Sequence, residues 1–256
     1  MHYLNHAACG LMSDATRNTM HAYMCQEQQM GSYLAAKQVH KDIASVYQKI
    51  AQAIHARPED IALTQGNSDG WGRIISSMDW RQGGRIEEMP CNADGLVDID
   101  ALDRLLQTPT SLVVLTWFSS NSPLIQPAQT IGALCAQYRT PLLIDAAQAM
   151  GQWHIDVQAL QCTALTAPGR KWLRGPRGTG FAYVHPDFLP SLHPLGADHF
   201  SRPWQTDSTW VHRTDAKKLE LSESSIALRL GLSQTFDEWN AAGAAKVQEQ
   251  IQERAT

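Results

Sequence analysis

The apolar residues of the chain fall into short unbroken runs separated by stretches with helical spacing. The runs are rich in aliphatic or β-branched residues and are bounded by glycine or polar residues, which is typical of strands buried on both faces. On this basis we predict strands at 60–66, 111–118, 141–148 and 178–184. Their alternation with helical stretches favours an α/β fold.

Helical spacing accounts for much of the remaining chain. Residues 14–55 contain few helix breakers, so we predict two helices joined near Gly31. Further helices are predicted at 69–78 and 130–139, and the tail from about 214 onward, rich in Ala, Gln and Glu, is predicted to be helical as well. Buried strands separated by helices predict a three-layer αβα arrangement with a mainly parallel sheet covered on both faces.

Composition narrows the class of protein further. The 256 residues are 43% hydrophobic and 18% charged, which suits one large globular domain or one domain with an appendage. A formal net charge of −4 implies no broad basic surface, so we expect no nucleic-acid partner. No apolar stretch approaches the roughly 18 residues of a membrane-spanning helix, and the first residues lack the pattern of a signal peptide. Five scattered cysteines without metal-ligand spacing fit a reduced, cytoplasmic chain.

Four polar clusters lie at or near predicted strand ends, where ligands bind in open α/β sheets. The cluster GNSDG can be a simple helix cap, or the backbone N–H groups of Asn67 and Ser68 can hold a phosphate at a helix N-terminus. Asp145 ends an apolar strand, where it either pairs with a cation or serves a ligand. The other clusters are SSNS at 119–122 and GRK at 169–171.

A single ligand, pyridoxal phosphate (PLP), explains all four clusters. This cofactor needs a lysine for its Schiff base and an acid opposite its pyridine nitrogen, which Lys171 and Asp145 supply. Ser68 would bind the phosphate, and Gln148 with Asn121 the ring oxygen. A dinucleotide fits less well, because the run GPRGTG has the wrong glycine spacing and precedes a strand rather than a helix.

Several segments resemble the class V aminotransferase-fold PLP enzymes, the group of cysteine desulfurases and isopenicillin N epimerase-like proteins. The segments include YLNHAACGLMS, DIALTQGNSDGWGRII, LLIDAAQAMGQ and GRKWLRGPRGTGFAYV. The resemblance implies the large domain of PLP-dependent transferase fold type I and a homodimer. It implies the Schiff-base role for Lys171, the pyridinium partner for Asp145, the phenolic-oxygen contact for Gln148, the phosphate turn for Ser68 with Asn67, and a ring-oxygen or substrate contact for Asn121. Asn5 and His6 fall where the family brings its N-terminal segment to the substrate.

The sequence also departs from the family. RQGG at 81–84 runs directly into RIEEMP at 85–90, which predicts that one βα unit is deleted together with the residue that stacks on the cofactor ring. We expect a large domain at 1–212, a remnant of the C-terminal domain at 213–256, and a small domain that is largely missing. No cysteine matches the desulfurase nucleophile, which argues against a desulfurase.

Two functions follow. The first is a PLP-dependent enzyme of the aminotransferase, lyase or epimerase type acting on a small amino-acid substrate. The second is a truncated, catalytically silent relative that keeps the fold, either with or without PLP binding. In the enzyme, the amine of Lys171 would act as the general base at the substrate Cα. Arg170 would either lower the pKa of Lys171 through like-charge repulsion or point into solvent.

Overall fold

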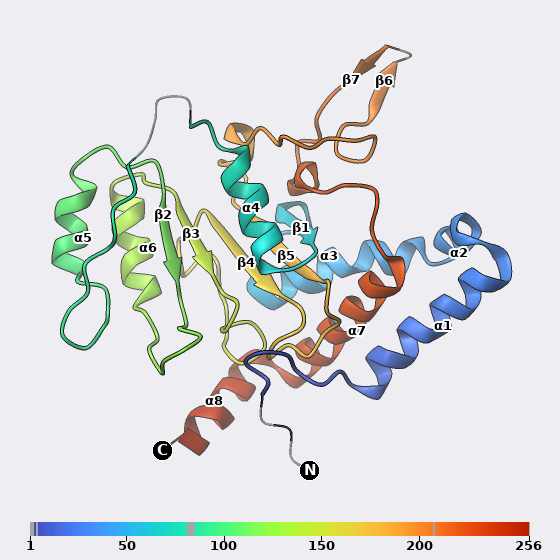
Figure 1. The fold of residues 1–256 in the computed structure, drawn as a ribbon, viewed down its shortest axis with the longest axis horizontal. Helices are drawn as coiled ribbons and strands as arrows, with labels where there is room; N and C mark the ends of the chain where they lie inside the picture. The colour runs from blue at the N-terminus through green and yellow to red at the C-terminus, as the bar shows by residue number, and fades with distance from the viewer. Residues whose placement is uncertain (1–2, 4, 81–84, 207, 256) are drawn as a thin grey trace.

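The computed structural model describes residue 3 and residues 5–80, 85–206 and 208–255. Its centre is a five-stranded sheet in the order β1-β5-β4-β3-β2 (Figure 1). The strands β2, β3 and β4 run parallel, and β5 is antiparallel to both β4 and β1, so the predicted mainly parallel sheet is confirmed. The bounds are β1 (Ile61–Thr64), β2 (Val113–Thr116), β3 (Leu142–Asp145), β4 (Ala164–Pro168) and β5 (Gly180–Val184).

Helices cover both faces of the sheet, as the alternation of runs predicted. The helices that share a core with Ile144 and Phe181 are α3 (His40–Ile54), α5 (Ile99–Leu106), α6 (Ala128–Gln137) and α7 (Ile226–Ala242). On the opposite face α4 (Asn67–Ser77) packs through Ile74 against Leu143 and Ala182. Figure 1 shows α4 in front of the sheet, with α3 and α7 behind it. The remaining helices are α1 (Asp14–Met30), α2 (Ser32–Gln38) and α8 (Ala244–Ala255).

Local sequence explains where several helices begin. Ser13 caps α1, because its hydroxyl oxygen accepts a hydrogen bond of 3.0 Å from the backbone N–H of Thr16. Asp98 caps α5 in the same way through the N–H of Ala101 at 3.0 Å. Both residues leave the helical conformation just before the first turn, so the sequence itself fixes these boundaries.

The N-terminal helices differ in one detail from the prediction. The join at Gly31 is confirmed, but the expected second helix is divided at Val39, whose φ of −102° and ψ of 14° interrupt it between α2 and α3. Val39 is β-branched and half-buried, and no glycine or proline marks the break. Strand β4 and a hairpin of β6 (Trp204–Thr206) and β7 (Thr209–Trp210) were not predicted.

The C-terminal tail is less helical at its start than predicted. A 3₁₀ turn at Ala216–Leu219 leads into a non-helical stretch, and α7 begins only at Ile226. The stretch is held open because the buried carboxylate of Glu220 accepts the N–H of Leu63 on the edge strand β1 at 2.9 Å. From there α7 packs on α1 and α3 and places Phe236 in the main core. The predicted division of the chain at 212 and 213 stays a prediction.

Candidate functional site

Lys171 lies in the loop between β4 and β5, at the end of the sheet where β3 and β4 also end. Its side chain is half-buried, and its amine makes no hydrogen bond or ion pair with any residue that the structure describes. Burial lowers the pKa of Lys171, and the neighbouring Arg170 guanidinium lowers it further, while Asp145 acts in the opposite direction. An unpaired lysine with a lowered pKa holds more of the neutral amine, which is the reactive form.

Asp145 is the last residue of β3 and lies between two parallel neighbours. It is in register with Thr116 of β2 and with Thr166 of β4. One carboxylate oxygen accepts the N–H of Ala147 at 2.8 Å, and the other accepts no hydrogen bond from the described residues. Thr166 is fully buried, and its hydroxyl has no partner within the described ranges. The end of β3 therefore presents one carboxylate oxygen beside an unpaired hydroxyl.

The N-terminus of α4 lies over these strands. A Cβ on Gly70, in the first turn of α4, would lie 3.2 Å from the methyl of Thr64 and 3.3 Å from the methyl of Thr166. The helix begins at Asn67, as the phosphate-turn prediction requires. The side-chain oxygen of Asn67 is buried without a partner among the described residues, whereas Ser68 is exposed. The fold thus brings the predicted phosphate turn to the strand that neighbours Asp145.

Gln148 is the most fully bonded of the predicted site residues. Its side-chain nitrogen donates to the carbonyl of Ala7 at 3.2 Å and to the hydroxyl of Ser120 at 3.1 Å. Its side-chain oxygen accepts the indole N–H of Trp172 at 2.7 Å. Gln148 therefore joins the N-terminal segment, the loop after β2 and the lysine loop, and a contact with a ring oxygen would have to replace or share one of these bonds.

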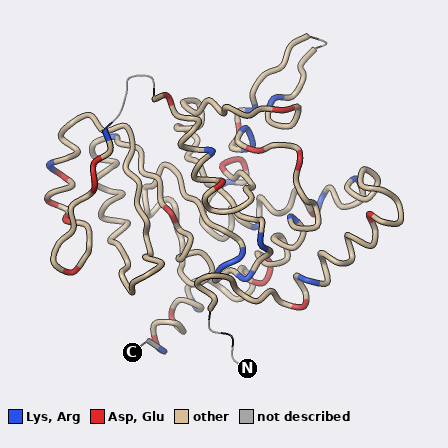
Figure 2. The backbone as a smooth tube through the Cα atoms, viewed as in Figure 1, with Lys and Arg blue, Asp and Glu red and all other residues tan. Residues whose placement is uncertain are grey.

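The N-terminal segment forms one wall of the site. The N–H of Gly10 donates to the carbonyl of Arg170 at 2.7 Å, and the guanidinium of Arg170 donates to the carbonyl of Ala8. The ring of His6 stacks on Trp172 with centroids 6.0 Å apart. Figure 2 shows Lys and Arg residues gathered where this segment passes the loop after β4. His6 thus contacts the lysine loop through Trp172, whereas Asn5 is exposed. The predicted approach of these two residues to the substrate stays a prediction.

The predicted contact of Asn121 with the ring oxygen or the substrate stays a prediction. Asn121 is exposed in the loop after β2, and its backbone N–H donates to the hydroxyl of Ser119 at 3.3 Å. Ser120, not Asn121, contacts Gln148. Thr166 and Trp172 were also missed by sequence reasoning. A polar residue within the apolar run ALTAP was the available signal for Thr166, whereas nothing local distinguished Trp172 from a core aromatic.

These observations test whether PLP fits the residues present. The unpaired amine of Lys171, the free carboxylate oxygen of Asp145 and the two buried unpartnered oxygens, of Asn67 and Thr166, all occur at the same end of the sheet. Buried polar groups in proteins are normally paired, so unpaired groups gathered in one place point to a missing polar ligand. The donor and acceptor set fits PLP. Within the described ranges no group of three His, Cys, Asp or Glu side chains is arranged to hold a metal ion.

The five-stranded sheet and the helices around it define the chain as having the fold of the PLP-dependent cysteine desulfurases, in a shortened form. The family model described as Aminotransferase class-V matches residues 71–256. The chain belongs to the aminotransferase class-V family. Along the described parts of the chain, no helix combines the length and the apolar character needed to span a membrane.

Two curated proteins are similar in sequence to most of this chain. It is 26% identical to a probable hercynylcysteine sulfoxide lyase of Mycobacterium tuberculosis, over 98% of this chain and 66% of that protein. It is 24% identical to a probable cysteine desulfurase of Methanothermobacter thermautotrophicus, over 85% of this chain and 60% of that protein. The chain thus spans about two thirds or less of the length of these curated relatives.

Solved structures show the same fold at low identity. A lysine mutant of C-DES with glycine covalently linked to its PLP cofactor superposes with a TM-score of 0.88 at 22% identity, covering 98% of this chain and 74% of that one. The apo cysteine desulfurase of Thermococcus onnurineus NA1 gives a TM-score of 0.84 at 17% identity, covering 97% of this chain and 69% of that one. The likeness extends over nearly the whole of this chain.

Proposed function

We propose that the chain binds PLP covalently through Lys171 and acts on a small amino-acid substrate. The observation that carries this proposal is the half-buried amine of Lys171, which has no partner among the described residues and lies at the same sheet end as Asp145. Burial and Arg170 lower the pKa of this amine, which favours nucleophilic attack on a carbonyl group. A structural lysine would instead be exposed or paired.

Each residue of the site has a distinct task in this proposal. PLP, when bound, supplies an electron sink for carbanion chemistry at the substrate Cα. The free oxygen of Asp145 would hold a proton on the pyridine nitrogen, and Lys171, once displaced by the substrate amine, would accept the Cα proton. The backbone N–H groups at the start of α4, at Asn67 and Ser68, would hold the phosphate. Gln148 would orient the ring from its network with Trp172.

Within the aminotransferase, lyase and epimerase types, we favour a lyase acting on a carbon–sulfur bond. A hercynylcysteine sulfoxide lyase and a cystine C–S lyase among the similar proteins support this choice. Cysteine desulfurases are similar to the chain as well. Desulfurase chemistry needs a nucleophilic thiolate in addition. Burial raises the pKa of Cys135 to about 11 and that of Cys162 to about 12, which makes these two of the five thiols poor nucleophiles. None of the five matches the desulfurase nucleophile in sequence.

A second candidate is a relative that binds PLP without turnover. One observation favours it: no described residue between α4 and α5 forms a strand of the central sheet, in line with the predicted loss of a βα unit. The predicted junction at 81–84 lies outside the described residues. The ring-stacking residue that this unit would carry has no counterpart in the sequence.

The experiment is PLP addition to the purified protein, followed by borohydride reduction and peptide mass spectrometry. We expect a visible absorption band and a PLP mass increment on Lys171. Lys171→Ala should lose both, while Lys37→Ala, which alters an exposed lysine on α2, should keep them. If no increment forms, the cofactor proposal is wrong.

A second measurement separates the two candidates. Cysteine, cystine, alanine and aspartate are added in turn to the PLP-loaded protein, and the band and the release of pyruvate and sulfide are followed. A spectral change with product release supports the enzyme. A band that stays constant with every amino acid supports the silent relative.

A further inference from the structure

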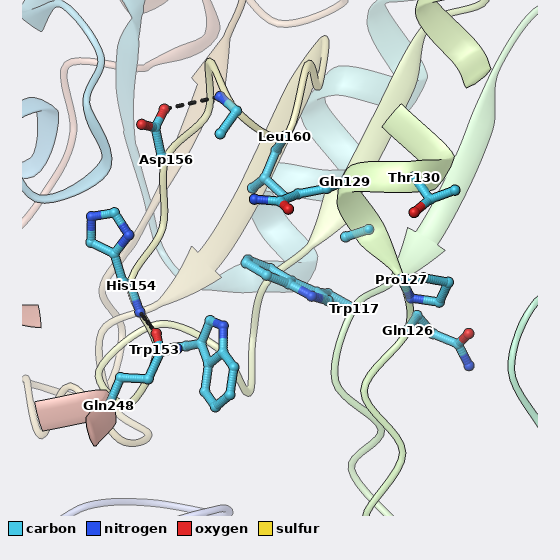
Figure 3. A pocket seen from close by; sticks show the side chains of 12 residues that line it. Trp117, Gln126, Pro127, Gln129, Thr130, Trp153, His154, Asp156, Leu160 and Gln248 are labelled. Atoms are coloured by element: carbon cyan, nitrogen blue, oxygen red, sulfur yellow. Dashed lines mark hydrogen bonds between the residues drawn. The ribbon is translucent and has the colours of Figure 1, made fainter. Parts of the chain in front are cut away.

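A hollow of about 490 Å³ lies between the start of α6, the loop at 153–156 and helix α8 (Figure 3). Its volume is within the range of pockets that hold small molecules, about 300–1,000 Å³. The side chains that matter for its chemistry are Trp117, Gln129, Thr130, Trp153 and His154.

This hollow is on the opposite face of the sheet from the side chain of Asp145. Thr116 is in register with Asp145, and Leu115 is in register with Ile144. Side chains alternate along a strand, so Thr116 and Asp145 share the face covered by α4. Trp117 follows Leu115 in the alternation and belongs with Ile144 to the core on the other face. The hollow and the lysine site are therefore separated by the sheet.

Trp117 brings an unpaired donor to the hollow. The residue is only 6% exposed, and its indole N–H donates to no residue that the structure describes. The N–H is therefore available to a molecule in the hollow. In Figure 3 the ring of Trp117 lies across the middle of the hollow, above Trp153. An acceptor on a ligand would satisfy this N–H.

The first turn of α6 adds further donors. The helix is preceded by Pro127, has no side-chain cap and carries no acidic residue in its first turn. The backbone N–H groups of Gln129 and Thr130 donate to no carbonyl of the described backbone, so they remain available together with the positive end of the helix dipole. Both residues line the hollow.

Among the described residues that line the hollow, Asp156 is the one with a carboxylate, and both of its oxygens are bonded to other residues. One oxygen of Asp156 accepts the backbone N–H groups of Gln158 and Ala159, at 2.8 and 3.1 Å. The other lies 3.0 Å from a ring nitrogen of His55. Although burial opposes it, these bonds lower the pKa of Asp156. Both oxygens of Asp156 are engaged by these bonds, so neither is free to take a donor of the hollow.

We propose that this hollow is a binding site for a small planar aromatic carboxylate. The aromatic ring would lie against Trp117 and Trp153, which supply flat apolar walls. The carboxylate would accept hydrogen bonds from the Trp117 indole N–H and from the start of α6. This site is independent of the lysine site, because the sheet separates the two.

The test is isothermal titration of the PLP-treated protein with indole-3-acetate, with benzoate and with neutral indole. We expect one saturable site for the two carboxylates and at least about tenfold weaker binding of indole, since the helix N-terminus discriminates by charge. Thr130→Glu places a carboxylate at the anion position and should weaken indole-3-acetate about tenfold. The acidic residue also favours the first turn of α6, so the variant should fold.

Two controls make the result decisive. Gln52→Glu introduces the same charge on an exposed residue of α3 and should leave the affinity unchanged. Trp117→Phe keeps a ring but removes the N–H, and should weaken the carboxylates more than indole. The proposal is overturned if the carboxylates show no saturable binding, if indole binds equally well, or if Thr130→Glu binds as the parent does. Lys171→Ala should bind indole-3-acetate unchanged, and a loss of binding there would place the ligand at the lysine site instead.

Discussion

Gly10 lies directly against the backbone of Lys171. A Cβ on Gly10 would come within 2.4 Å of the Lys171 carbonyl oxygen, and the Gly10 N–H donates to the carbonyl of Arg170 at 2.7 Å. These residues are 161 positions apart in the sequence, yet the wall of the candidate site depends on their contact. Only a residue without a side chain permits it.

Gly10→Ala should therefore detach the N-terminal segment from the lysine loop. The added methyl meets backbone atoms that cannot move independently, and overpacking of this kind costs about 1–3 kcal/mol. We expect weaker PLP retention, measured by dialysis of the loaded protein, with the fold preserved in circular dichroism. Gly72→Ala is the matched control, since no atom of the described residues beyond its own stretch of helix lies within 4 Å of the added Cβ. Equal PLP retention in both variants would contradict the contact.

Arg170 should set the pH at which Lys171 becomes reactive. Because its guanidinium lowers the pKa of Lys171, Arg170→Gln should raise that pKa. The neutral amine is the attacking form, so the rate of PLP attachment should rise with pH and reach its midpoint at a higher pH in the variant. Stopped-flow absorbance across a pH series measures the midpoint.

Arg177→Gln provides the comparison for that series. Arg177 is exposed in the same loop and forms no ion pair with the described residues. Its removal should leave the midpoint in place. A midpoint that moves downward in Arg170→Gln would show that Arg170 does not act on Lys171 through its charge.

The bond between Trp172 and Gln148 should stabilise the fold as well as the site. Trp172→Phe removes the indole N–H and leaves the buried oxygen of Gln148 without this donor, which costs about 1–3 kcal/mol. Urea denaturation measures the free energy of unfolding. Trp80→Phe removes an indole bond to the carbonyl of Ile75 on an exposed side chain and should cost clearly less. The reverse order would disprove the role of Gln148 as a junction.

Glu220 should hold the edge of the sheet beside α4. Its carboxylate is 1% exposed and binds the hydroxyl of Tyr47, the N–H of Leu63 and the guanidinium of Arg229. Glu220→Gln leaves Arg229 without its counter-charge, and breaking a buried pair costs about 3–5 kcal/mol. The unfolding midpoint in urea should fall sharply. In contrast, Glu223→Gln, three residues along and exposed, should change little. A similarly small effect at both positions would contradict this role of Glu220 at the edge of the sheet.

The strands and the chemical residues of the site were predictable because their signals are local. An apolar run between glycine and polar residues identifies β3, and Asp145 follows from its position at the end of that run. Lys171 was singled out by the cofactor chemistry and by the family resemblance, because the strand before it was not predicted. The break at Val39 was not predictable, because its neighbours are all compatible with a helix. The delayed start of α7 was missed for a different reason: Glu220 bonds to Leu63, which is 157 residues away.

The sequence alone predicted the αβα class and the helix start near Asn67, and it singled out Lys171 and Asp145 as candidates, since each of these signals is local in the chain. The tertiary structure decided how these elements meet. It placed the N-terminal segment against the lysine loop and joined Gln148 to Trp172 and Ser120 by hydrogen bonds. It also left the Thr166 hydroxyl, on the strand next to Asp145, without a partner among the described residues. It also opened the hollow at Trp117 on the far face. These contacts join distant parts of the chain, and hydrophobic periodicity carries no information about which distant atoms will face one another.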